Sequence, residues 1–150
     1  MATPLSPHFT LAELCQSSTA TQRSIDNSTS DPAIIANLTA LATNVLEAIR
    51  TQFSPFSPTS GYRCPALNAA VGGVPTSQHA YGQAADIVIA GVDLAVLGNW
   101  IIDNLDFDQV IHEHGGGATW IHVSYTTAAT GNRKNILAYN GTSYAAVARF

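Results

Sequence analysis

Two histidines and an aspartate in the second half of the chain have the residue types of a metal site. His79 lies in the polar run 77–83, Asp86 follows it closely, and His122 lies within the apolar segment 120–124. Zinc accepts two imidazole nitrogens and one carboxylate oxygen as ligands, and catalytic zinc sites typically leave a fourth position for water. Because zinc lowers the pKa of that water to about 7 and polarises a carbonyl, such a site suits amide hydrolysis.

The surroundings of these residues favour a metal site. Gly82 lets the backbone bend between the first two ligands, and Asp86 opens the apolar run 86–89, where a carboxylate is costly unless it is paired or metal-bound. In a strand, His122 would face away from its two apolar neighbours, on the same side as Trp120 and Ser124. On residue types alone, another interpretation stays open, namely a core histidine, a helix-capping aspartate and a surface histidine.

The expected secondary structure that positions these residues consists of helices in the first half of the chain and mainly strands in the second half. Thr10 and Glu13 form a capping-box pattern that opens a short helix from Leu11 to about Ser17. The best helix starts at Pro32, capped by residue 30 or 31, and runs to Arg50 with apolar residues at helical spacing. The other expected elements are a turn-like segment over 19–30, a loop over 54–59, helices over 65–71 and 92–104, a strand over 85–89, two strands over 107–114 and 119–125 joined by a glycine turn, and a hairpin over 136–147.

This order predicts a single domain over residues 1–150, of the α+β class, with helices packed on a small antiparallel sheet that carries one zinc site. Hydrophobic residues make up 46% and charged residues 11%, which excludes disorder. The net charge of −4, with six Lys and Arg, excludes the basic footprint of a nucleic-acid binder. The apolar runs are shorter than the roughly 20 residues that span a bilayer, so no membrane partner is expected. We expect a monomer.

Two further observations concern the compartment. The N-terminus has no signal peptide pattern, so synthesis in the cytoplasm is expected. Cys15 and Cys64 follow no metal-binding pattern, and we expect two reduced thiols, although sequence alone leaves a disulfide open.

At the residues with metal-site character, the chain resembles the zinc D-alanyl-D-alanine carboxypeptidase family of peptidoglycan peptidases. The opening segment 9–14 and the stretch 25–27 resemble the smaller, phage-type members of that family. The central and C-terminal motifs are Ser60-Gly61-Tyr62-Arg63, Leu67-Asn68, Val71-Gly72-Gly73, Ser77-Gln78-His79, then Gly82, Ala84 and Asp86, and finally Trp120-Ile121-His122-Val123-Ser124.

The resemblance implies that Zn²⁺ is bound by His79, Asp86 and His122. It also implies that Arg63 is the active-site arginine, which can hold a substrate carboxylate or stabilise a developing oxyanion. The alternative for Arg63 is a surface salt bridge. For substrate binding we consider Ser77, which alternatively shapes the loop, and Trp120, which alternatively packs in the core.

The catalytic base is the point at which the sequence departs from the family pattern. Many relatives carry a glutamate three residues before the last histidine ligand, where this chain has Thr119. The preceding strand offers Glu113 instead, with His114 and His112 as alternative bases. Alternation along the strand predicts Glu113 on one face and both histidines on the other.

The sequence therefore predicts a zinc peptidase that cuts stem peptides or cross-links of peptidoglycan, its expected partner. The context expected from the resemblance is a phage or prophage lysin or a virion-associated wall hydrolase, made in the host cytoplasm and acting in the periplasm or cell wall. The alternative is a catalytically inactive, zinc-containing peptidoglycan-binding module, because a similar fold occurs in hedgehog-type signalling proteins, where zinc can be structural.

Overall fold

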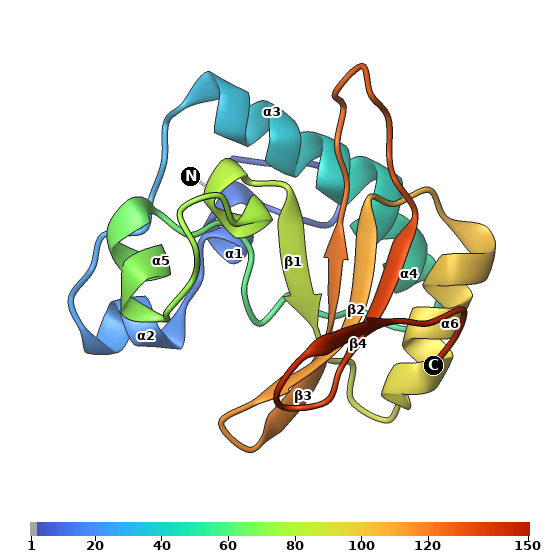
Figure 1. Cartoon of the computed structure of the whole chain (residues 1–150). Coiled ribbons are helices and arrows are strands. Elements are labelled where there is room, and N and C mark those ends of the chain that lie inside the picture. Colours follow the sequence, from blue (N-terminus) through green and yellow to red (C-terminus); the bar gives the residue numbers. More distant parts are fainter. Residues whose placement is uncertain (1–2) are drawn as a thin grey trace.

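A five-stranded sheet forms the centre of the protein in the computed structural model, which describes residues 3–150 (Figure 1). The strand order is β1-β3-β2-β4-β5, so neighbours in the sheet are not always neighbours in the chain. The strands are β1 (Ala84–Ile87), β2 (Gln109–Gly115), β3 (Ala118–Ser124), β4 (Asn135–Tyr139) and β5 (Tyr144–Ala146). This arrangement confirms the predicted α+β class.

The sheet is mostly antiparallel, but β2 and β4 pair in parallel, which the sequence patterns did not predict. The reason is the long connection over 125–134, which carries the chain back to the start of β2. There the amides of Lys134 and Asn135 donate to the carbonyls of Phe107 and Asp108. Strand β4 therefore begins beside the beginning of β2 and runs in the same direction.

Helices occupy the first half of the chain and the segment before β2. Thr10 and Glu13 form the predicted capping box, and the Asp31 side chain caps the helix that Pro32 opens. A short helix over 18–22, which overlaps the segment expected to be turn-like, was not predicted. It forms because the Ser17 hydroxyl accepts from the Ala20 amide and caps it. The helices are α1 (Leu11–Leu14), α2 (Ser18–Gln22), α3 (Pro32–Leu41), the π-helical η1 (Ala42–Leu46), α4 (Glu47–Gln52), α5 (Pro65–Ala70), the 3₁₀ turn η2 (Gln78–Tyr81) and α6 (Leu94–Asn104).

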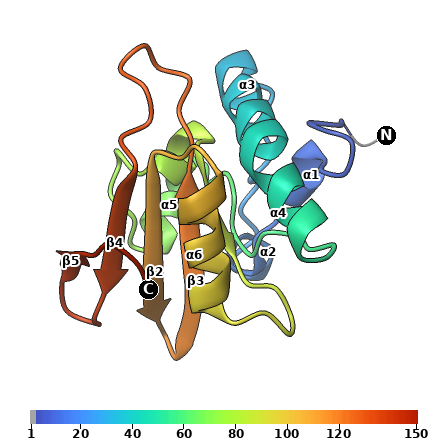
Figure 2. The ribbon, with the colours of Figure 1, turned by 90° about the vertical axis from the view of Figure 1, so that its right-hand side faces the viewer.

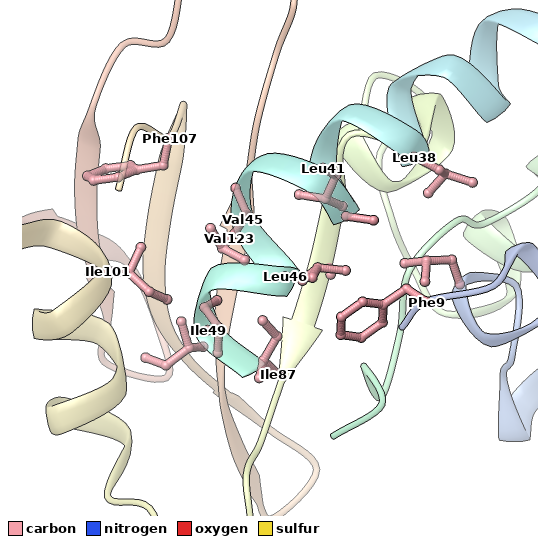
Figure 3. Close-up of a cluster of buried hydrophobic side chains, with 14 of the residues drawn as sticks. Phe9, Leu38, Leu41, Val45, Leu46, Ile49, Ile87, Ile101, Phe107 and Val123 are labelled. Atoms are coloured by element: carbon pink, nitrogen blue, oxygen red, sulfur yellow. The ribbon is translucent and has the colours of Figure 1, made fainter. Parts of the chain in front are cut away.

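The elements α3, η1 and α4 form one continuous helix, Pro32–Gln52, on one side of the sheet (Figure 2). By length and mean hydropathy alone this helix could cross a membrane. However, one of its faces is fully buried in the core, as in the core helix of a globular domain. Figure 3 shows this face meeting side chains of the sheet and of α6; its fully buried residues are Leu38, Leu41, Ala42, Val45, Leu46 and Ile49.

The two faces of β3 have different roles. Ile121 and Val123 are fully buried in the hydrophobic core beneath the helices. Trp120 and His122 alternate with them and line a pocket on the other face, as the sequence predicted. The sheet is therefore anchored by one face and carries polar side chains on the other.

Candidate metal centre and active site

His79, Asp86 and His122 converge at the pocket face of the sheet. One ligand atom from each residue can be chosen so that all lie within 4.8 Å of one another, and all three residues are buried. Nε2 of His79 and Nδ1 of His122 each lie 3.3 Å from Oδ1 of Asp86. The structure thus brings together the three ligands predicted from the sequence.

The turn η2 positions His79. The Ser77 hydroxyl accepts from the His79 amide at 3.3 Å and begins the turn. Gly82 ends it in the left-handed region, with φ of 73°, and a Cβ there would lie 2.9 Å from the Ile34 carbonyl oxygen. Nδ1 of His79 donates to the Gly61 carbonyl at 2.7 Å, which leaves Nε2 with its lone pair facing Asp86.

Strand pairing positions the other two residues. Asp86 and His122 are directly opposed partners in the β1–β3 ladder. On the other side of β1, the Asp86 amide donates to the Ser60 carbonyl and the Thr59 amide donates to the Asp86 carbonyl. These bonds hold segment 59–63 next to β1. Asp86 is the third residue of β1 rather than its first, so it lies inside the sheet and not at the strand's edge.

The polar atoms of the site fit a bound cation. Among the described residues, four buried side-chain atoms lack a hydrogen-bond partner, and Oδ1 of Asp86, which faces both histidines, is one of them. Although two ring nitrogens lie 3.3 Å from Oδ1 of Asp86, neither makes a hydrogen bond with it. A buried carboxylate oxygen without a donor is costly, and a metal ion held by these residues would remove that cost.

The protonation states of the site also suit metal binding. Burial lowers the pKa of His79, which keeps its ring neutral and able to donate a lone pair. Burial disfavours the charged form of Asp86, but the adjacent imidazoles outweigh that effect and hold the pKa of its carboxyl well below its usual range. A neutral imidazole beside an ionised carboxylate is the state that a metal ion requires of its ligands.

Arg63 points its guanidinium at the ligand cluster. Its Nη2 donates to Oδ2 of Asp86 at 3.5 Å, and its Nε donates to the Ser60 hydroxyl at 3.3 Å. Its backbone amide donates to the carbonyl of His79, which ties the arginine to the turn η2. The side chain is only 17% exposed, so Arg63 is not a surface ion pair, and burial lowers the pKa of its guanidinium. It remains charged and faces the pocket.

A pocket of about 890 Å³ opens over the three ligands. Arg63, Ser77, Glu113 and Trp120 all line it. Glu113 on β2 is the cross-strand partner of Trp120, two positions along β3 from His122. The side chains proposed from the sequence for catalysis and substrate binding therefore surround one cavity.

A comparison with protein families decides what kind of site this is. A family model described as Peptidase M15 matches residues 7–124, which covers the metal ligands, Arg63 and Glu113. The chain belongs to the peptidase M15 family. A search of curated proteins gave no significant match. M15 peptidases are metal-dependent, so the chain is a metallopeptidase, and the resemblance seen in the sequence is confirmed at the level of the family.

Of the two alternative bases, His114 lines the pocket of this M15 protein and His112 does not. His114 lines the same pocket as Glu113, with its ring 5.3 Å from that of Tyr139. His112 lies on the other face of the sheet, with its ring 5.7 Å from that of Phe150. The β2–β3 ladder keeps the predicted alternation, with His112 opposite Ile121 and His114 opposite Thr119. His114 nevertheless also lines the pocket, because it lies near the end of the strand beside Tyr139.

One hydrogen-bond network next to the M15 site, centred on Asp108, was not predicted from the sequence. Asp108 is buried, accepts from Gln78 Nε2 at 2.8 Å, and accepts from the amide and guanidinium of Arg133. It thus links the residue before His79 to the connection over 125–134. The only sequence signal was an acidic residue inside a buried strand start, which does not by itself identify its partners.

Proposed function

We propose that the protein is a zinc peptidase that hydrolyses peptide bonds in the stem peptides or cross-links of bacterial peptidoglycan. The observation that carries this proposal is the convergence of His79, Asp86 and His122 under a pocket lined by Arg63 and Glu113, in a chain of the M15 family. Zinc is the proposed ion because two imidazoles and one carboxylate form a donor set that catalytic zinc sites use.

When bound, zinc would act as a Lewis acid on the scissile carbonyl and would make a water molecule acidic enough to attack it near neutral pH. The remaining steps belong to side chains of this protein. Glu113 would take a proton from the attacking water and deliver it to the leaving amine, which is general acid–base catalysis by a carboxylate that lines the pocket.

Arg63 would bind an anionic group of the substrate. Its guanidinium is charged, largely buried and directed at the ligand cluster, so it can hold a substrate carboxylate or the developing oxyanion. Stem peptides of peptidoglycan carry free carboxylates, which supports them as the substrate class. Ser77 and Trp120 line the same pocket and would contact the peptide.

The test is mass spectrometry of purified peptidoglycan after incubation with wild-type protein and with Glu113→Gln. New fragments are expected from wild type, and their masses would identify the bond that is cut. Glu113→Gln should bind the metal as wild type does, with a rate lower by about 10²–10⁴-fold. A variant His114→Gln, altered at the pocket edge, should keep most of the activity.

The opposite result would support a different function. If wild type holds one zinc ion per chain and releases no fragments, the protein is the zinc-containing wall-binding module. If His114→Gln rather than Glu113→Gln abolishes the reaction, His114 is the base. The phage or prophage origin, with action in the periplasm, the wall or the virion, stays a proposal that rests on the resemblance of segments 9–14 and 25–27 to phage-type members.

A further inference from the structure

One wall of the pocket comes from a part of the chain outside the family match. Strands β4 and β5 follow residue 124, where that match ends. They extend the sheet beside β2 (Figure 2). Leu137 and Tyr139 on β4 and Tyr144 on β5 line the pocket. This hairpin therefore lies outside the residues that the family model matches and still reaches the candidate site.

Tyr144 makes the most direct contact between this hairpin and the site. Its hydroxyl donates to Oε1 of Glu113 at 2.6 Å, across 31 positions of sequence. Tyr139 is its partner in the β4–β5 ladder, and the two rings lie 4.7 Å apart at an angle of 35°. Tyr139 in turn stacks with His114. The phenol is thus held in place by the strand pairing and by a row of aromatic rings.

The energetics of this contact indicate a role beyond packing. Tyr144 remains 52% exposed, so its contact with Glu113 buries little apolar surface. A hydrogen bond of 2.6 Å between a hydroxyl and a carboxylate is short and charge-assisted, which makes it stronger than a neutral one. Burial of the hydroxyl and the bond to Glu113 raise the pKa of Tyr144, so the phenol stays a donor throughout the working range of a peptidase.

We propose that Tyr144 is a positioning residue for Glu113. By occupying Oε1, its hydroxyl fixes the orientation of the carboxylate and leaves Oε2 as the oxygen that exchanges a proton with water and the leaving amine. This inference rests on the proposed function, because it requires Glu113 to be the base. It assigns a task to a residue that lies beyond the part shared with the family model.

The test is steady-state kinetics of Tyr144→Phe on a peptidoglycan stem peptide. The variant keeps the aromatic stack and removes only the hydroxyl, so kcat should fall by about tenfold or more, which is the worth of a hydrogen bond to a charged group. KM, zinc content and Tm should stay close to wild type. Tyr125→Phe, which removes a tyrosine hydroxyl outside the pocket, should behave as wild type.

A double-mutant cycle with Glu113→Gln shows whether Tyr144 acts through Glu113. Under single-turnover conditions, Tyr144→Phe should cause little further loss in the Glu113→Gln background, because the group that it positions is already gone. An equal loss in both backgrounds would overturn the inference, as would a KM rise with kcat unchanged.

The cycle also separates this inference from the proposed function. An active wild type, an inactive Glu113→Gln and an unaffected Tyr144→Phe would overturn the role of Tyr144 alone. An inactive wild type, or a fully active Glu113→Gln, would overturn the proposed function and the role of Tyr144 with it.

Discussion

At the scale of single residues, the metal ligands were predictable because short motifs around them resemble those of a known family, which residue types alone did not establish. A histidine in a polar loop, an aspartate in an apolar run and a histidine alternating with core residues are local patterns that favour a metal site. The resemblance to a known family was needed to choose His79, Asp86 and His122 over the alternative of unrelated core and surface residues. Tyr144 was not predictable, because its bond to Glu113 joins residues far apart in the chain. Such a contact depends on the register of β4 and β5, which no local pattern determines.

His122→Ala should lose the bound metal. The variant removes one of the three proposed ligands from a buried site, namely the imidazole whose Nδ1 lies 3.3 Å from Oδ1 of Asp86. Metal content of tag-free protein, measured by elemental analysis, should fall from one ion per chain to a small fraction. His112→Ala is the matched control, since His112 lies on the opposite face, and it should keep the full content. Full metal content in His122→Ala would refute the ligand assignment.

At the scale of elements, helices and hairpins were found from local signals, whereas the sheet order was not. The capping box at Thr10 and the proline at residue 32 mark helix starts through local hydrogen bonds and geometry. The parallel pairing of β2 with β4 depends on where the connection over 125–134 leads the chain. The guanidinium of Arg133, which lies in that connection, donates to the buried carboxylate of Asp108. This tertiary contact holds the connection in place and so determines where β4 begins.

Gly82 should tolerate alanine less well than Gly72, although both have positive φ values. At Gly72 a Cβ meets nothing within 4 Å, so Gly72→Ala should cost about 1–2 kcal/mol from the backbone conformation alone. At Gly82 a Cβ would also clash with the Ile34 carbonyl oxygen, so Gly82→Ala should lower the free energy of unfolding by about a further 1–3 kcal/mol. Urea denaturation of both variants measures the difference, and equal stabilities would contradict the close packing of η2 on α3.

Asp108→Asn should destabilise the fold in a pH-dependent manner. Hydrogen bonds from Arg133 outweigh the effect of burial and, with Gln78, hold the pKa of Asp108 below its usual range. The ionised carboxylate therefore contributes stability above the unfolded-state pKa of about 4, and this contribution is lost as pH falls through the lower folded-state pKa.

Urea denaturation can test that sign. At pH 7, the free energy of unfolding of Asp108→Asn should lie about 1–3 kcal/mol below that of wild type. The difference between the two proteins should shrink as the pH is lowered below about 4. A difference that stays constant from neutral pH into this acidic range would show that the charge of Asp108 does not stabilise the fold.

At the scale of the whole molecule, the candidate metal site joins three elements that are far apart in the sequence. His79 lies on the turn η2, whose end packs against α3, Asp86 lies on β1, and His122 lies on the neighbouring strand β3. An ion that binds all three in the folded state, and few of them together in the unfolded state, contributes directly to the free energy of folding.

Removal of the metal should therefore lower the thermal stability of the whole domain. If the free ion is present at about 100 times its Kd, binding contributes about 2.7 kcal/mol, which corresponds to a Tm change of roughly 5–10 °C for a domain of this size. Calorimetry with and without a chelator measures this change. His122→Ala should show no response to the chelator, and an equal response in both proteins would mean that the chelator acts elsewhere.

The most direct test of the central claim is a zinc titration of metal-free wild-type protein, with hydrolysis of a peptidoglycan stem peptide as the readout. Activity should be absent without metal, should rise in proportion to added zinc, and should level off at one ion per chain. His122→Ala should remain inactive throughout the titration. Hydrolysis by the metal-free protein, or zinc-restored activity in His122→Ala equal to that of wild type, would contradict the account.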